Sequence, residues 1–129
     1  MTKRLEFYRC KICGNTVQVL LNGEGELVCC GEQMELLSPK TVDEMKEKHV
    51  PIFMRGDKNT ISVKVGSELH PMTDEHYVMF IETISADKNK ISIEYLYPSM
   101  PPEIFSNINE DIALEYCNIH GLWEGKNND

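Results

Sequence analysis

The chain has 129 residues, a net charge of −8 and an ordinary hydrophobic fraction of 41%. This length allows one domain, or a small module followed by a modest one. The acidic balance argues against a general nucleic-acid binder, because neutralising phosphates requires clustered Lys and Arg. No apolar run approaches the roughly 20 residues that cross a bilayer, and no apolar signal-peptide stretch follows the basic N-terminal residues. We therefore expect a cytoplasmic protein with no membrane segment.

The first 38 residues predict a module too small to be stable without help. Segment 16–21 predicts a strand whose apolar side chains, Val17, Val19 and Leu21, lie on one face. Little other apolar surface is available for a core. Below roughly 40 residues, a metal, disulfides or oligomerisation usually supplies the missing stability. We therefore expect residues 1–38 to be a separate domain.

Residues 39–129 carry the signals of a β-rich domain. In segment 61–65, Ile and Val alternate with polar residues, and segment 91–97 alternates in the same way. The continuous apolar run at 77–81 predicts a strand that is covered on both faces. The charged segment 42–48 fits a helical turn or a solvated loop. Several short strands separated by turn residues predict an all-β sandwich.

The cysteines favour metal binding over disulfides. There are five cysteines and four histidines, and an odd number of cysteines leaves one thiol outside any disulfide framework. Cytosolic thiols are normally kept reduced. Cys10-x-x-Cys13 and the adjacent pair Cys29-Cys30 together supply four thiolates. Four sulfurs in a tetrahedron suit Zn²⁺ or a single iron ion.

The adjacent pair Cys29-Cys30 is unusual for a tetrahedral site. Adjacent cysteines spread around a metal less easily than a C-x-x-C pair, so we expect a distorted tetrahedron. Gly14 and Gly31, one after each cysteine pair, give the backbone freedom to wrap a metal. The same residues also fit a purely structural zinc knuckle. A disulfide between Cys29 and Cys30 is a further alternative.

The remaining soft ligands form a candidate second metal site. They are His49, His70, His76, Cys117 and His120. The C-x-x-H spacing of the last two can place both on one ion. Each histidine alone is as compatible with a polar surface residue as with a ligand. Only their joint presence with one cysteine suggests a mixed nitrogen and sulfur site.

Four blocks of the sequence resemble one known family. They are Cys10-x-x-Cys13 with Cys29-Cys30, Glu47-Lys48-His49-Val50-Pro51, His70-Pro71-Met72 with His76, and Glu115-Tyr116-Cys117-Asn118-x-His120-Gly121. In this order they resemble desulfoferrodoxin, the two-iron form of superoxide reductase. The resemblance covers essentially the whole chain, and no expected ligand is missing.

The resemblance implies an all-β protein with two iron ions per chain. A desulforedoxin-like module over residues 1–38 would precede an immunoglobulin-like β-sandwich over residues 39–129. The ligands of the first iron, an Fe(Cys)4 centre, would be Cys10, Cys13, Cys29 and Cys30. The second iron, an Fe(His)4(Cys) centre, would have four histidines in a plane and a cysteine thiolate on one axial side: His49, His70, His76, His120 and Cys117.

The resemblance also implies an activity and its partners. The reaction would be the one-electron reduction of superoxide to hydrogen peroxide by a homodimer, with an external donor such as rubredoxin restoring ferrous iron. Five protein ligands on an ion that favours six leave one position open. The thiolate would push electron density through the iron towards that position. Backbone N–H groups near Asn118 and Ile119 could hydrogen-bond the sulfur and tune it.

Glu47 and Lys48 precede a candidate ligand, so their side chains could reach the open face of the second iron. The charged run around them is equally typical of a solvated loop. The resemblance favours function for both residues. Lys48 would supply the local positive potential that a protein of charge −8 otherwise lacks. Glu47 could occupy the open position in the ferric resting state.

Two rival functions come from other classes. In the first, the protein is an electron carrier in which both irons only pass electrons. In the second, it is a structural zinc protein with no redox role. A visible absorption spectrum separates the second from the others, because Zn²⁺ is a d¹⁰ ion without redox chemistry. The carrier is separated by testing whether superoxide reoxidises the reduced histidine site with peroxide as product.

Overall fold

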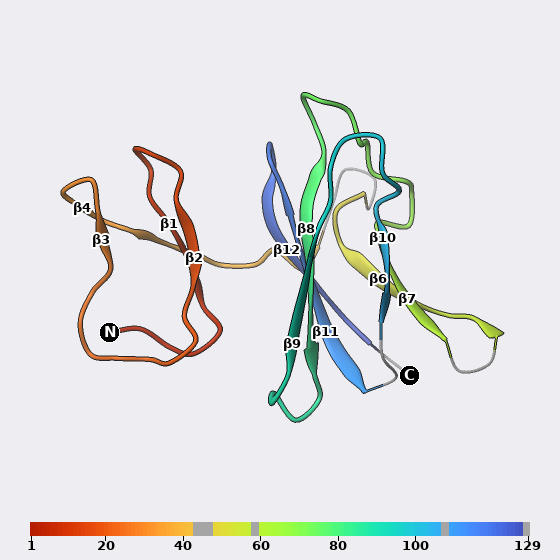
Figure 1. Cartoon of the computed structure of the whole chain (residues 1–129), viewed down its shortest axis with the longest axis horizontal. Helices are drawn as coiled ribbons and strands as arrows, with labels where there is room; N and C mark the ends of the chain where they lie inside the picture. Colours follow the sequence, from red (N-terminus) through yellow and green to blue (C-terminus); the bar gives the residue numbers. More distant parts are fainter. Residues whose placement is uncertain (43–47, 58–59, 107–108, 128–129) are drawn as a thin grey trace. The chain divides into compact units, whose positions relative to one another are not determined.

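The structure, a computed structural model, describes residues 1–42, 48–57, 60–106 and 109–127. The regular elements in these ranges are all β-strands and none is an α-helix (Figure 1), so the predicted all-β class is confirmed. None of the described residues belongs to a helix that could span a membrane. The chain divides into two compact units, Met1–Ser38 and Pro39–Asp129.

The first unit contains a three-stranded antiparallel sheet and a separate two-stranded hairpin. The sheet has the order β2-β1-β5, and the hairpin is formed by β3 and β4. The strands are β1 (Phe7–Arg9), β2 (Thr16–Gln18), β3 (Val28–Cys29), β4 (Glu32–Gln33) and β5 (Glu35–Leu37). The buried hydrophobic side chains of this fully described unit are Phe7, Cys10 and Val19. A core this small agrees with the expectation from length that the unit needs an additional source of stability.

The predicted strand at 16–21 is shorter than expected. It ends at Gln18, and only Val19 of its three apolar residues is buried. Val17 is 40% exposed and Leu21 is 89% exposed. The partner strand breaks at Leu5, whose positive φ of 77° takes the chain out of the extended conformation. The prediction of a continuous apolar face was therefore wrong, because a two-residue period requires an unbroken ladder.

The second unit consists of two antiparallel sheets (Figure 1). The three-stranded sheet has the order β10-β7-β6, and the four-stranded sheet has the order β12-β11-β8-β9. The strands are β6 (Pro51–Arg55), β7 (Ile61–Val65), β8 (Val78–Ser85), β9 (Ile91–Tyr95), β10 (Glu103–Ser106), β11 (Glu110–Cys117) and β12 (Gly121–Lys126). Both sheets contribute to one core, which makes this unit a sandwich.

The core of the sandwich lies between β7 and the two central strands of the larger sheet. Val63 and Val65 of β7 pack with Ile81 of β8 and Ala113 of β11, and all four are 0% exposed. The predicted alternation along β7 is confirmed, since its polar residues are only half-buried. The apolar run at 77–81 does open a buried strand, although β8 continues to Ser85.

Candidate metal centres

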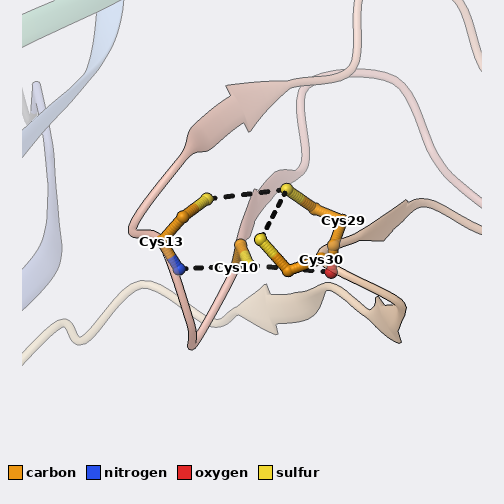
Figure 2. A group of neighbouring side chains, drawn as sticks. All are labelled: Cys10, Cys13, Cys29 and Cys30. Carbon is orange, nitrogen blue, oxygen red and sulfur yellow. Dashed lines mark hydrogen bonds between the residues drawn. The ribbon is translucent and has the colours of Figure 1, made fainter.

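Four sulfur atoms converge in the first unit (Figure 2). Cys10 and Cys13 come from the turn after β1, whereas Cys29 ends β3 and Cys30 follows it. The Sγ atoms of Cys13 and Cys29 are 3.6 Å apart, and those of Cys29 and Cys30 are 4.0 Å apart. All four Sγ atoms lie within 4.8 Å of one another. The S–S bond of a disulfide is about 2.05 Å long, so the structure does not have the alternative Cys29–Cys30 disulfide.

The backbone around Cys10 is arranged to stabilise a thiolate. The N–H of Cys13 donates to Cys10 Sγ at 3.5 Å, and the N–H of Asn15 donates to Cys13 Sγ at 3.5 Å. The first of these bonds is the main reason why the pKa of Cys10 falls to about 6. Thiolates are the form that binds a metal.

The adjacent cysteines fit one site because Cys30 adopts an unusual backbone conformation. Cys30 and Gly31 form the two-residue connection between β3 and β4, with positive φ angles of 54° and 76°. Positive φ at both positions is the signature of a type I′ hairpin turn. The neighbouring sulfurs, Cys13 first, raise the pKa of Cys30 to about 12. Four thiols this close do not all ionise without a cation, so the donor set fits a thiolate-binding metal such as iron or Zn²⁺.

Four imidazole rings form a closed ring of neighbours in the second unit. The centroid distances between successive rings, from His49 through His70, His76 and His120 back to His49, are 4.9, 4.7, 5.1 and 4.6 Å. Each adjacent pair is close to perpendicular, and the diagonal from His49 to His76 is 6.3 Å. Cys117 Sγ lies 3.9 Å from His120 Nδ1. The structure therefore brings together every histidine and the one cysteine predicted for the second site.

All five side chains come from one end of the sandwich. His49 precedes β6, His70 follows β7, and His76 precedes β8. Cys117 is the last residue of β11, and His120 lies in the turn before β12. Antiparallel pairing aligns these ends: Val65 of β7 lies opposite Pro51, whereas Cys117 lies opposite both Val78 and Gly121. The register of the strands thus brings together five side chains that are far apart in the sequence.

Two of the histidines, His70 and His76, have features that suit metal binding. His70 Nδ1 donates to the backbone oxygen of Pro71 at 2.7 Å, which leaves Nε2 as the ring's metal-binding atom. Burial lowers the pKa of His70 to about 4, and burial is also the main reason why the pKa of His76 is lowered. His70 Nε2 and His76 Nε2 are buried without a hydrogen-bond partner. Buried polar atoms are rarely left unpartnered, so these two nitrogens fit a metal ion.

The surroundings of Cys117 shift the pKa of its thiol in opposite directions. Its side chain is 0% exposed, and this burial is the main cause that raises its pKa. Backbone N–H groups of His120 and Ile119 lower the pKa, as does the charge of Lys40, whereas the carboxylate of Glu115 raises it. Backbone donors to the sulfur were predicted near Asn118 and Ile119. Ile119 is one of them, and the other is His120.

Asn118 has a different role from the one predicted. Its side-chain oxygen accepts from the N–H of Tyr77 at 2.9 Å, and its Nδ2 donates to the backbone oxygen of Glu75 at 2.9 Å. Its own N–H donates to the Tyr77 oxygen at 3.2 Å. Asn118 therefore ties the turn that carries Cys117 and His120 to the loop that carries His76.

Two supporting residues were missed from the sequence. Gly66 has a φ of +83°, and a Cβ there would lie 2.5 Å from the backbone oxygen of Lys48, so only glycine lets this chain segment approach. The Gly66 N–H donates to the Val50 oxygen at 3.1 Å, which fixes the segment around His49. The ring of Trp123 stacks on His49 with a centroid distance of 4.7 Å and an angle of 17°. A glycine directly after a predicted strand was the available signal for Gly66, but nothing local marks Trp123.

The two residues predicted beside the open face differ in what the structure describes. Lys48 is half-buried, and its charge is one of the causes that lower the pKa of His76. Its positive charge therefore acts on the histidine site. Glu47 lies outside the described residues.

The whole chain matches the models of one family. Residues 2–37 match the desulfoferrodoxin N-terminal domain, and residues 41–126 match desulfoferrodoxin. The chain belongs to the desulfoferrodoxin family. This confirms the resemblance read from the four sequence blocks, and the two side-chain clusters correspond to the family's two iron centres.

Individual relatives extend this family assignment. The chain is 46% identical over 129 residues to the desulfoferrodoxin of Desulfarculus baarsii, covering 98% of this chain and 100% of the relative. It is similar in structure to the superoxide reductase of Treponema pallidum, with a TM-score of 0.76, 28% identity, and coverage of 97% and 100%. It also resembles the one-iron superoxide reductase of Giardia intestinalis, with a TM-score of 0.52, 27% identity, and coverage of 64% and 98%.

Proposed function

We propose that this protein is a superoxide reductase, which reduces superoxide by one electron to hydrogen peroxide at a non-haem iron with four histidine ligands and one cysteine ligand. The observation that carries the proposal is the closed ring of four imidazoles beside a fully buried cysteine sulfur. The likeness to the superoxide reductase of Treponema pallidum over 97% of the chain supports it.

The ligand assignment is part of the proposal. The first iron is held by Cys10, Cys13, Cys29 and Cys30, and the second by His49, His70, His76, His120 and Cys117. Two observations support the second set: the buried, unpartnered Nε2 atoms of His70 and His76, and the distance of 3.0 Å between His49 Nε2 and His120 Nδ1. The mutual approach of four sulfurs within 4.8 Å supports the first.

The chemistry divides between the ion and the protein. When bound, ferrous iron supplies one electron, so that superoxide plus one electron and two protons gives hydrogen peroxide. Neutral imidazoles add no charge, and the thiolate of Cys117 lowers the charge of the site by one while donating electron density. The five ligands leave one coordination position for substrate. Backbone N–H groups of Ile119 and His120 moderate the donation by Cys117.

Lys48 is proposed to attract the substrate anion. The charge of Lys48 is one of the causes that lower the pKa of His76. This supports a position from which that charge also acts on an anion in the site. In a protein of charge −8, a local cation is needed to offset the long-range repulsion of an anion.

Glu47 is proposed to compete with anions for the open position of the oxidised site. Replacing it with alanine should change the ferric spectrum and make it more sensitive to added azide. The first encounter of reduced protein with superoxide should be unchanged. Titration of the oxidised Glu47→Ala protein with azide, next to the wild type, measures this. An identical spectrum and an identical azide affinity would reduce Glu47 to a solvated loop residue.

The organisation around the reaction is also proposed. Residues 1–38 form the desulforedoxin-like iron module, and residues 39–129 form the catalytic domain of a homodimer. A rubredoxin-like donor restores ferrous iron. A cytoplasmic location is supported by the five free cysteines, because a reducing compartment keeps thiols available as ligands.

One experiment tests the function against its rivals. Metal analysis of the purified protein is combined with a superoxide consumption assay on pre-reduced protein, with peroxide measured as product. Two irons per chain and about one peroxide per oxidised histidine site support the reductase. Zinc in both sites, with no visible absorption, would establish the structural protein. Iron in both sites that superoxide leaves reduced would establish the electron carrier.

A further inference from the structure

Lys40 has no part in the mechanism described so far, yet it is attached to the histidine site at several points. Its backbone N–H donates to the oxygen of Leu122 at 3.0 Å, and its own oxygen accepts from the N–H of Glu124 at 2.8 Å. These bonds place Lys40 in a parallel bridge with Trp123. Its Nζ donates to the backbone oxygen of His120 at 3.1 Å. Lys40 therefore holds the start of β12 and the turn before it.

The same ammonium also lies over an aromatic ring. Lys40 Nζ is 5.0 Å from the centroid of the Trp123 ring, within the roughly 6 Å range of a cation–π interaction. Trp123 is only 6% exposed, and its ring stacks on the imidazole of His49. One lysine thus contacts both the backbone of His120 and the ring that stacks on His49.

The position of Lys40 complements that of Asn118. Asn118 ties the turn to the loop of His76, whereas Lys40 ties the same turn to the chain segment before the first sandwich strand. His120 is exposed, unlike the buried His49 and His70. An exposed ligand has little packing to orient it, so hydrogen bonds to its backbone have to do so.

The charge of Lys40 adds an electrostatic effect to the geometric one. Lys40 Nζ lies 3.1 Å from the backbone oxygen of His120, a candidate ligand, so its positive charge is beside the histidine site. A fixed cation near a redox site disfavours the state of higher positive charge. Ferric iron carries one more positive charge than ferrous iron, so Lys40 favours the reduced state.

We propose that Lys40 is a positioning residue of the histidine–cysteine site: its ammonium clamps the turn of His120 and the ring of Trp123, and its charge makes the site easier to reduce. The inference rests on the proposed reductase function and deepens it. Lys40 does not touch substrate, so its effects are expected in the geometry and the reduction potential of the site before they appear in the rate.

The test uses the fully loaded protein and a reporter that the chain supplies. Trp123 is the one tryptophan of the sequence, so acrylamide quenching of its fluorescence measures how well its ring is covered. In Lys40→Met, the quenching constant should rise about twofold. The ratio of reduced to oxidised iron in the histidine site at a fixed ambient potential should fall about threefold, equivalent to about 30 mV for a one-electron couple.

Three further variants separate the clamp from the charge. Lys40→Arg should restore both values, because a guanidinium donates to carbonyls and stacks on aromatic rings. Lys40→Gln keeps a donor for the His120 carbonyl without the charge, so it should retain part of the wild-type quenching but show the lowered potential. Lys126→Met is the matched control: it removes an exposed lysine at the far end of the same strand and should leave both values unchanged.

The outcomes are distinct. Wild-type quenching and wild-type potential in both Lys40→Met and Lys40→Gln would overturn the inference, and so would equal changes in Lys126→Met. Neither measurement uses superoxide. A wild-type protein that is inactive towards superoxide would therefore overturn the proposed function alone, without altering the result for Lys40.

Discussion

The two candidate metal sites of this chain differ in what holds their candidate ligands in place. The first unit buries three hydrophobic side chains, and one of them, Cys10, is itself a candidate ligand. The second unit buries thirteen among its described residues, and its ligands project from the ends of strands that pack on this core. We therefore expect the sulfurs of the first unit to depend more strongly on a metal for their arrangement than the imidazoles of the second, which are positioned by strands packed on a core.

This difference fits the two kinds of chemistry. A site that organises its own domain cannot lose its metal without losing the fold, because binding and folding free energies are the same quantity there. A site on a preformed scaffold can leave one coordination position open without losing the fold. Burial also lowers the pKa of His70 and of His76 before any metal binds, which favours the neutral form of these two imidazoles.

The largest expected effect comes from Cys13→Ser, which removes a ligand from the metal-dependent unit. Structural metal binding contributes on the order of 10 kcal/mol to such small domains, so residues 1–38 should lose their fold. The histidine site should keep most of its reactivity with superoxide, within about a factor of two. Limited proteolysis and metal analysis measure the first outcome, and pulse radiolysis measures the second. Loss of reactivity in a variant that still loads the histidine site would contradict the independence of the two sites.

Cys117→Ser should have the opposite effect to Cys13→Ser: the activity should be lost and the fold retained. The sandwich should remain folded, because its core does not rest on this ligand alone. The sulfur-to-iron charge-transfer band of the histidine site should disappear, and the reductase rate should fall by more than the roughly 10–100-fold loss that follows changes to residues supporting a ligand. Visible absorption and circular dichroism of the same sample check both parts. Survival of the band would show that Cys117 is not a ligand.

The sequence predicted more of the histidine site than of its supports, and the reason is physical. His and Cys stand out as candidate ligands because few other residues bind soft metals, and the resemblance to desulfoferrodoxin grouped them into one predicted site. Gly66, Trp123 and Lys40 act through contacts between distant segments, and Lys40 lies 80 positions from His120. No local pattern encodes such a contact.

The strands likewise divide into those that the sequence pattern predicted and those that it did not. The alternation along β7 was predicted because one face is buried and the other is not. Much of β11 could not be read by alternation, since its Leu114 and Glu115 are adjacent and both buried. In the first unit, the strand at 16–21 was overestimated because the break at Leu5 lies on the partner strand.

Lys48→Ile tests how the histidine site attracts its substrate. The rate with superoxide should fall about tenfold, equivalent to about 1.4 kcal/mol. The Debye length is about 10 Å at 0.1 M salt, so repulsion by the net charge of −8 is already screened, whereas a lysine close to the site is still felt. The wild-type rate should therefore fall as salt rises, and the variant's salt dependence should flatten or invert.

Pulse radiolysis across a salt series measures both rates. Lys126→Ile removes the same charge from an exposed position on β12 and serves as the control, with a rate close to that of the wild type. A Lys48→Ile protein with the wild-type rate and salt slope would remove Lys48 from the mechanism.

The smallest expected effect concerns the hairpin turn that presents the adjacent cysteines. Gly31 has a φ of +76°, and a Cβ there would meet no atom within 4 Å. Gly31→Ala therefore adds backbone strain without a clash, at a cost of about 1–2 kcal/mol. Because binding and folding are coupled in this unit, the strain should appear as weaker metal retention, by roughly 5- to 30-fold at about 1.4 kcal/mol per tenfold. Competition with a chelator measures it.

Gly25→Ala is the matched control for this turn. A Cβ at Gly25 also meets no atom within 4 Å, and its φ lies outside the left-handed region. Alanine there should slightly stabilise the unit, by about 0.4–1 kcal/mol, because it restricts the unfolded chain. The two substitutions should therefore shift metal retention in opposite directions. If both variants held their metal equally well, the positive φ of the Cys30–Gly31 turn would contribute nothing to the site, and the contrast between a metal-organised unit and a preformed one would lose its structural basis at this turn.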